Sequence, residues 1–395
     1  MEGQESEPED DRATAGVDGN PALTFGQAMD LLHSDPDRAA ALLEPQLSSS
    51  DGAEAVRARV LLGLHAWLGD DPDTCSHLLH EAQSCIHLLG DSEAAAQFHL
   101  LQGRLQRSRG EYRQAALSFG QGAQVARRLA DTPLELDALN LQASAVNALG
   151  QPQRALQLLR RAVKLGEQTG HLERLATIRN NTGDLERVLG NYPEALEELV
   201  AARSIFSAAG KPDRASAINL INLANLYQDM GRQHEARRFL MDAREEGEQL
   251  ADADVVAVAL NSLANSDLQL GDYQVARERF AAALVKARTL GDTAYQADNL
   301  DGLGQALAAL GDYEGALETH EQTLELARAD RDYEGELDAR VNLGRDQLHL
   351  GRPEQAVQHL DAALELAAEL EYSAREVEVH ELLSAASEAA GDPWA

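Results

Sequence analysis

The sequence predicts an all-α solenoid of about nine helical hairpins, because three features recur along it at one interval. A glycine suited to end a helix appears every 40 or 41 residues from Gly110 to Gly351. A small residue stands seven positions before each of these turns, and an alanine stands five positions after it. A fixed period of this length is typical of stacked repeats, in which each repeat packs only against its neighbours.

Composition excludes several classes of function. The 395 residues carry a net charge of -32, whereas nucleic acids and anionic membranes attract basic surfaces, so we expect neither as a partner. No apolar run approaches the ~20 residues that span a bilayer, so membrane insertion is not expected. Cys75 and Cys85 are expected on one helix, pointing apart, which favours reduced thiols and a cytoplasmic location. The scarcity of lysine among the 34 basic residues suggests a bacterial source.

Taken in order, the chain begins with a predicted disordered tail, residues 1–20, which holds seven acidic side chains and one arginine. Residues 21–395 form the predicted solenoid, with turns near residues 34, 70, 110, 150, 190, 231, 271, 311, 351 and 391. Asn191, Asp272 and Asp312 follow their turns and are expected to cap the second helix of a hairpin. The array reaches its last turn without a capping helix, so we expect it to be truncated at the C-terminal end.

Small residues at fixed positions predict close packing of the two helices in a hairpin. A glycine or alanine before the turn lets the helices approach, and a leucine or phenylalanine nine positions after the turn fills the remaining space. His320 and Thr323 interrupt this pattern in the eighth repeat. That repeat is therefore expected to be the most loosely packed.

These recurring positions resemble the tetratricopeptide repeat, in which a turn glycine is followed two positions later by tyrosine and five positions later by alanine. The clearest examples are Gly190-Asn191-Tyr192 with Ala195 and Gly271-Asp272-Tyr273 with Ala276. The resemblance covers residues 22–395 and is to the long, 40-residue type found in bacterial regulators and in LGN-type and kinesin light chain scaffolds. HEAT and armadillo repeats overlap in length but lack this turn. The resemblance implies a right-handed superhelix whose first helices line a concave groove.

Asparagine supplies the strongest indication of function. Eleven of the thirteen asparagines fall in predicted first helices, where this residue is a poor helix former. A side-chain amide both donates and accepts hydrogen bonds, which suits the backbone of an extended peptide. The resemblance, with the residues beside it, gives a predicted peptide-binding set of Arg104, Arg107, Asn140, Asn147, Asn180, Arg187, Asn222, Asn225, Gln228, Asn261, Asn265, Asp301, Gln305 and Arg345, next to Ser144, Asp184 and Asp298.

Two other interpretations remain open at this stage. Asparagines can also join one repeat to the next, and Asn181, Asn222 and Asn342 occupy positions near the repeat interface. His77, His80 and His87 are spaced to share one helix face, which could bind a metal ion. We favour plain surface histidines, because no further ligand completes the set, and predict neither a metal nor a cofactor.

No motif for catalysis is present, since phosphate-binding loops, HExxH, GxSxG and paired CxxC are all absent from the sequence. We therefore expect a protein that is not an enzyme, a sensory or regulatory scaffold whose partner is a protein or an extended peptide. The alternative hypothesis is a self-associating module of a larger bacterial signalling protein, with homo-oligomers formed through the end repeats. The sequence does not identify the partner.

Overall fold

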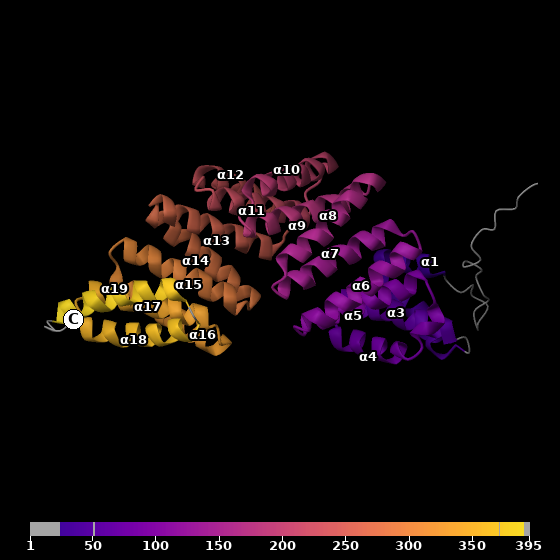
Figure 1. Ribbon diagram of the computed structural model, residues 1–395, viewed down its shortest axis with the longest axis horizontal. Coiled ribbons are helices and arrows are strands. Elements are labelled where there is room, and N and C mark those ends of the chain that lie inside the picture. Colours follow the sequence, from indigo (N-terminus) through magenta and orange to yellow (C-terminus); the bar gives the residue numbers. More distant parts are fainter. Residues whose placement is uncertain (1–23, 50–51, 371, 391–395) are drawn as a thin grey trace, which may run out of the picture. The chain divides into compact units, whose positions relative to one another are not determined.

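The computed structural model describes residues 24–49, 52–370 and 372–390. Within these residues the chain forms nineteen α-helices, two short 3-10 helices and no strand, so it is the predicted all-α solenoid (Figure 1). The predicted tail, residues 1–20, and the turn near residue 391 lie outside the described residues. The chain divides into two compact units, Met1–Asn191 and Tyr192–Ala395.

Unit 1 contains the first nine α-helices, and within it successive helices pack against one another in chain order. Their bounds are α1 Phe25–Ser34, α2 Pro36–Leu43, η1 Glu44–Ser48, α3 Gly52–Leu68, α4 Pro72–Gln83, η2 Ile86–Leu89, α5 Glu93–Ser108, α6 Tyr112–Arg128, α7 Thr132–Ala148, α8 Pro152–Thr169 and α9 Leu172–Val188.

Unit 2 contains the remaining ten α-helices, which pack in the same serial way. Their bounds are α10 Tyr192–Ala209, α11 Arg214–Asp229, α12 Gln233–Gln249, α13 Ala253–Leu270, α14 Tyr273–Leu290, α15 Thr293–Ala309, α16 Tyr313–Asp330, α17 Tyr333–His349, α18 Pro353–Glu369 and α19 Ser373–Ala390. The right-handed superhelix expected for the array as a whole stays a prediction.

The turns lie where the glycine period predicts them. The seven turn glycines from Gly110 to Gly351 have φ between 70° and 84°, a left-handed conformation that glycine adopts without the steric cost of a Cβ atom. Asp70 occupies the same position one repeat earlier with φ of 58°. Helix α1 ends at Ser34, at the position of the first predicted turn.

Helix capping follows a different rule from the predicted one. Asp312 accepts a hydrogen bond from the backbone N–H of Gly315, as expected (3.1 Å). Asp272 instead lies 3.5 Å from the guanidinium of Arg237, and Asn191 donates its amide N–H to Glu186. The regular caps stand in the loops between hairpins, where an aspartate accepts from a backbone N–H three residues later at Asp131, Asp213, Asp252, Asp292 and Asp332.

The predicted match between small and large residues within a hairpin is confirmed. A Cβ atom added to Gly103 would lie 2.6 Å from the ring of Phe119, and one added to Gly344 would lie 2.7 Å from Leu360. Both distances are too short for atoms that do not bond, so the absence of a side chain is what admits the large residue opposite. In these two repeats the first and second helices therefore approach as closely as a residue without a Cβ atom allows.

The eighth repeat is not loosely packed, so that prediction was wrong. His320 is 1% exposed and Thr323 is also buried. The ring of His320 fits against Gly304, and its Nδ1 lies 2.7 Å from the carboxylate of Asp346, which is 2% exposed. The polar side chain is tolerated because α17 supplies a hydrogen-bonding partner at the depth where other repeats carry an aliphatic residue.

Buried carboxylates form a second set of contacts that the hydrophobic pattern does not reveal. Asp267 on α13 has no exposed surface and pairs with Arg279 on α14 and with Arg237 on α12 (3.2 Å). Burial raises the pKa of Asp267, against the effect of the two arginines. In unit 1, Glu186 on α9 is likewise buried and pairs with Arg160 on α8 (2.7 Å). These ion pairs tie first helices to the second helices on either side.

Helix α4 ends at Gln83, earlier than predicted, because Ser84 and Cys85 are weak helix formers and a 3-10 helix follows. Two predictions were therefore wrong: Cys75 and Cys85 do not share a helix, and His87 is not on one face with the other two histidines. Both thiols are free, and burial raises the pKa of Cys75 to about 11. Among the described residues, no group of three potential ligands could hold a metal ion. None of the described helices combines the length and apolar character that a bilayer crossing needs.

We predict that Gly103→Ala destabilises unit 1 by about 1–3 kcal/mol, because its methyl group would overlap the ring of Phe119. Gly63→Ala is the matched control, since its methyl group would meet Leu79 at an ordinary 3.5 Å. That control should gain up to about 1 kcal/mol from higher helix propensity. Urea unfolding followed by circular dichroism measures both changes, and equal effects of the two substitutions would contradict the packing argument.

We also predict that His320→Leu costs about 3 kcal/mol although leucine occupies this position in other repeats, because Asp346 then loses its buried partner. The double variant His320→Leu with Asp346→Ala should recover most of that loss. A double-mutant cycle by thermal unfolding checks this. Additive losses would show that the pair is not coupled.

Candidate functional site

The predicted binding residues lie on the first helices of the repeats. In unit 1 these helices are α5, α7 and α9, and in unit 2 they are α11, α13, α15 and α17. We call the surface that these residues form in each unit its first-helix face. Six of the predicted residues belong to unit 1 and eight to unit 2, and each face is described by itself.

The first-helix face of unit 1 contains a pocket of about 220 Å³ between α7 and α9. The polar residues around it include two that the sequence assigned to the site, Asn140 and Asn147. Ser144 and Asn147, which line the pocket from α7, are both exposed and can therefore contact a partner directly. The full lining is Asn140, Ala143, Ser144, Asn147, Leu159, Asn181, Asp184, Leu185 and Val188.

Hydrogen bonds fix the polar groups of this pocket. The amide N–H of Asn181 on α9 donates to Oδ1 of Asn140 on α7 (2.8 Å). The guanidinium of Arg187 donates to the carboxylate of Asp184 one helical turn away (3.0 Å). Asn180, by contrast, is only 4% exposed, so this member of the predicted set offers a partner almost no surface.

The α5 end of the same face is charged. Arg104 and Arg107 are half-buried there. Burial lowers the pKa of Arg104, and the nearby carboxylate of Asp137 on α7 opposes that effect. Asp137 accepts a hydrogen bond from Arg174 on α9 (2.9 Å). Arginines of α5 and α9 therefore flank one carboxylate across three successive first helices.

In unit 2, amide side chains form a ladder from one first helix to the next. Gln228 on α11 donates to the backbone carbonyl of Ser262 on α13 (3.3 Å). Asn265 donates to Oδ1 of Asn261 (3.1 Å), and Asn261 donates to Oδ1 of Asn299 on α15 (3.0 Å). Three predicted site residues are thus joined through hydrogen bonds rather than isolated on the surface.

The ladder continues around Asp301 on α15. Its carboxylate accepts from Gln305 (2.7 Å) and from Asn342 on α17 (2.8 Å). Arg345 donates to Oδ1 of Asn342 (3.3 Å) and to Glu378 on α19. Asn222 and Asn225 lie on α11, where both are half-buried.

These contacts bear on the two interpretations of the asparagines. Asn181 and Asn342 do join adjacent first helices, as expected for residues near the repeat interface. Asn140 and Asn261 take part in the same bonds although they were assigned to the groove. A carboxamide has two N–H donors and two acceptor lone pairs, so one such bond orients the group and leaves capacity for a ligand.

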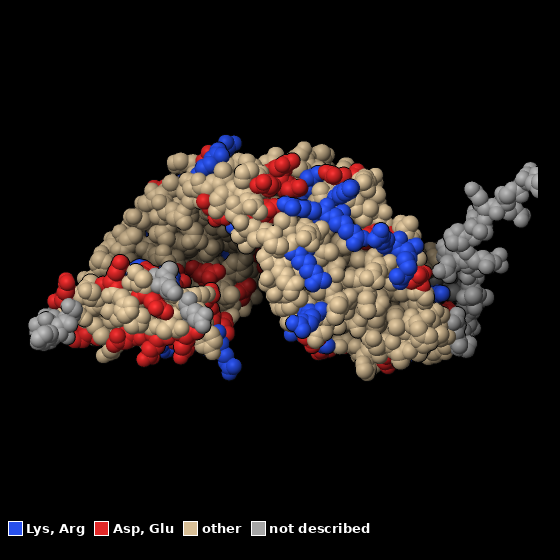
Figure 2. All heavy atoms as spheres, in the orientation of Figure 1, with Lys and Arg blue, Asp and Glu red and all other residues tan. Residues whose placement is uncertain are grey.

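Carboxylates gather on the first-helix face of unit 2. Asp298 on α15 lies near Asp301, Asp332 and Asp292, and partial desolvation together with these three charges raises its pKa. Residues 192–395 contain 39 acidic and 17 basic side chains. Acidic side chains dominate the visible surface of α16 to α18 in Figure 2.

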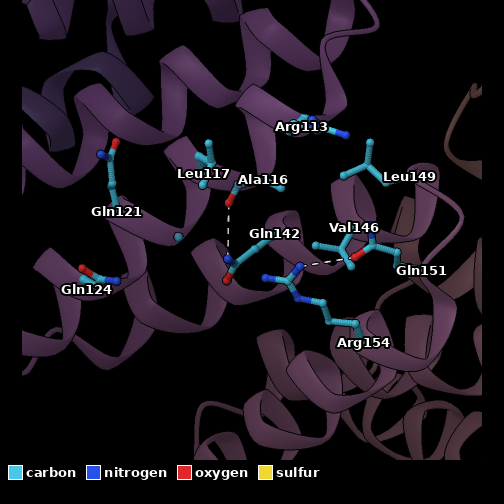
Figure 3. A pocket seen from close by; sticks show the side chains of 11 residues that line it. Arg113, Ala116, Leu117, Gln121, Gln124, Gln142, Val146, Leu149, Gln151 and Arg154 are labelled. Atoms are coloured by element: carbon cyan, nitrogen blue, oxygen red, sulfur yellow. Dashed lines mark hydrogen bonds between the residues drawn. The ribbon is translucent and has the colours of Figure 1, made fainter.

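The sequence reasoning missed a larger hollow on the other side of α7 in unit 1. It measures about 570 Å³, lies between α6 and α8, and is drawn in Figure 3. The sequence signal for it is a glycine inside α6, Gly120, which lines the hollow. A helix-interior glycine costs stability, so its presence there calls for a packing or surface reason.

Several solved structures share this fold. The apo form of the quorum sensor NprR from B. thuringiensis is 13% identical with a TM-score of 0.66, over 87% of this chain and 97% of that chain. A Rap protein complexed with Competence and Sporulation Factor is 14% identical with a TM-score of 0.61, over 92% and 96%. A signal transduction ATPase with a tetratricopeptide repeat sensor from Pyrococcus horikoshii is 14% identical with a TM-score of 0.64, over 87% of this chain and 54% of that one.

The sequence matches no curated protein significantly. Models of the tetratricopeptide repeat, however, match residues 100–169, 174–245, 255–329 and 337–362, which together make up more than half of the chain. These segments follow the hairpins of the fold, and their helix pairs carry the turn glycines and small residues already described. The chain therefore belongs to the tetratricopeptide repeat family.

Proposed function

We propose that this protein is a non-catalytic scaffold that holds an extended polypeptide against its first-helix faces, in a sensory or regulatory role in the bacterial cytoplasm. The observation that carries the proposal is the α7–α9 pocket of unit 1. It combines exposed Asn147 and Ser144 with a bonded amide pair, Asn140 and Asn181, behind them.

The chemistry of this pocket suits a peptide backbone. An extended peptide presents alternating N–H and C=O groups, and side-chain amides bind both kinds without selecting a particular side chain. The internal bonds of Asn140 and Arg187 hold the surrounding groups in place, so little conformational entropy is lost when a partner binds. The remaining predicted residues with surface on either first-helix face belong to this proposal, and Asn180 does not.

The charge of unit 2 indicates which kind of polypeptide segment it would bind. The carboxylate of Asp298 on unit 2 lies near those of Asp301 and Asp332, and desolvation together with these negative charges raises the pKa of Asp298. A lysine or arginine of the partner would relieve this repulsion. We therefore propose that the segment held by unit 2 is basic.

The comparisons support a regulatory role by analogy. One similar structure is described as a quorum sensor, another as a complex with Competence and Sporulation Factor, and a third as a signal transduction ATPase with a tetratricopeptide repeat sensor. A fold of this kind serves many functions, so the specific groups in the pocket remain the main support for the proposal.

Self-association is the second candidate, favoured by one surface. On α19, Val377 is 59% exposed, and Ser384 and Ala385 are exposed as well. In the other repeats, small and apolar residues of the first helix pack against the helix that follows. Sedimentation over a concentration series should show oligomers that disappear on Val377→Glu if this face mediates association, and a monomer at all concentrations excludes it.

We predict that Asn147→Ala with Ser144→Ala weakens peptide binding roughly thirtyfold, because each side chain supplies about 1 kcal/mol of hydrogen bonding. Peptides selected from a random library displayed on phage, panned against the full chain, serve as the probe in calorimetric titrations. Gln157→Ala, an exposed amide on the second helix α8, is the matched control.

The thermal midpoints of both variants should equal that of the parent, since none of the three side chains is buried. Selected peptides that bind the double variant as tightly as the parent, or that depend on Gln157 instead, would contradict the placement of the site on the first-helix face.

We further predict that Asp298→Asn raises the thermal midpoint at pH 7 by about one or two degrees. The raised pKa means that the folded state binds a proton more tightly than the unfolded chain, so stability falls as pH rises through the folded pKa. The gain should vanish at a pH below the ordinary pKa of an aspartate side chain, where Asp298 is protonated in both the folded and the unfolded state. A gain that is independent of pH would show that charge repulsion is not its cause.

A further inference from the structure

The hollow between α6 and α8 in unit 1 adjoins a second one. The larger, of about 570 Å³, and the smaller, of about 300 Å³, share Gly120, Gln124 and Gln142. Helix α7 forms the floor, and α6 and α8 form the walls (Figure 3). We call these two hollows together the back groove. It uses the side of α7 that carries Gln142 and Val146, whereas the first-helix pocket uses Asn140, Ser144 and Asn147.

Small residues of α6 keep the groove open. Ala116, Gly120 and Ala123 line it where larger side chains would fill the space. Gln142 lies across the floor and donates its amide N–H to the backbone carbonyl of Ala116 (3.3 Å), as the dashed line in Figure 3 shows. A Cβ atom on residue 120 would lie 2.7 Å from that amide nitrogen, so glycine leaves room for this arrangement.

Arginines line both ends of the groove. Arg113 and Arg154 lie at one end, and Arg127 and Arg161 lie at the other. Arg161 pairs with Glu135, and Arg154 donates to the side-chain carbonyl of Gln151 (3.3 Å). Within the described residues, Arg113, Arg127 and Arg154 are exposed and make no ion pair with a carboxylate. Their positive charge is therefore available to a ligand.

The surrounding helices concentrate this charge in a strongly acidic chain. Residues 93–169, from α5 to α8, contain ten lysines and arginines and six aspartates and glutamates, although the whole chain has a net charge of -32. Figure 2 shows basic side chains gathered over the α6 to α8 part of unit 1. Such a local reversal of sign attracts an acidic partner and repels the basic one proposed for unit 2.

Between the arginines the lining is apolar. Leu117 on α6 is 66% exposed, and half-buried Leu149, the C-cap residue of α7, lines the same hollow. An exposed leucine beside unpaired arginines fits a ligand that carries both carboxylates and an apolar side chain. Arginine binds carboxylates through two parallel N–H donors, which gives direction as well as affinity.

We propose that the back groove binds an acidic segment of a partner protein. The segment places an apolar side chain against Leu117 and Leu149, one carboxylate between Arg113 and Arg154, and another beside Arg127. This second site stands on different residues from the first-helix face and does not depend on the function proposed for that face.

The test uses a fluorescein-labelled peptide in which a central leucine is flanked on both sides by glutamates and aspartates. Binding to the full chain is followed by fluorescence anisotropy. We expect binding that weakens with salt, a loss when glutamines and asparagines replace the acids, and a smaller loss when serine replaces the leucine. An acidic peptide that does not bind, or a single-stranded oligonucleotide that binds in its place, would overturn the proposal.

Two variants locate the site. Arg113→Glu with Arg154→Glu should weaken binding of the acidic peptide at least tenfold. Arg38→Glu with Arg57→Glu makes the same change of charge on α2 and α3 and should change the affinity for the peptide less than twofold. Equal losses in the two would overturn the proposal in favour of a general charge effect. Gly120→Leu adds a side chain within the groove at constant charge and at a half-exposed position, and it should also abolish binding. Retained binding in this variant, with an unchanged thermal midpoint, would place the peptide elsewhere.

Discussion

The close approach of two helices at a glycine or an alanine is the contact on which each unit depends. Phe119 and Leu360 occupy space that even one methyl group on Gly103 or Gly344 would take away. Because the contact recurs at a constant separation within each repeat, every hairpin reaches nearly the same geometry, and hairpins of equal geometry can stack in series. The surfaces available for binding follow from this arrangement, because the first helices of the pairs form one face of a unit and the second helices form the other.

Ion pairs complete the packing that the small residues begin. Asp267 and Glu186 have almost no exposed surface, and arginines of neighbouring second helices compensate them. A buried carboxylate without such a partner would be strongly destabilising, so these contacts fix which arginines face inward. Arginines that are not used in this way, such as Arg113 and Arg127, remain at the surface and give the back of unit 1 its positive charge.

Binding capacity and structural support are not separate properties of the asparagine residues. Asn140 and Asn261 form bonds between repeats and remain partly accessible, so the same amide can orient a neighbour and meet a ligand. Asn180 shows the limit of inference from position alone, because a residue one place along the helix from Asn181 is buried. A helix turns by 100° per residue, and a small error in the assumed face moves a side chain from the surface to the interior.

The sequence by itself determined the fold class, the positions of the turns and the pairing of small with large residues. These depend on local backbone conformation and on a periodic pattern of volume, both of which are properties of residue type and spacing. Only the tertiary structure decided that Asp346 pairs with the buried His320, and that Gly120 of α6 leaves room for a groove between two arginine-lined ends. These features require side chains from helices tens of residues apart to meet, and such distances are set by packing in three dimensions and not by any regularity along the chain.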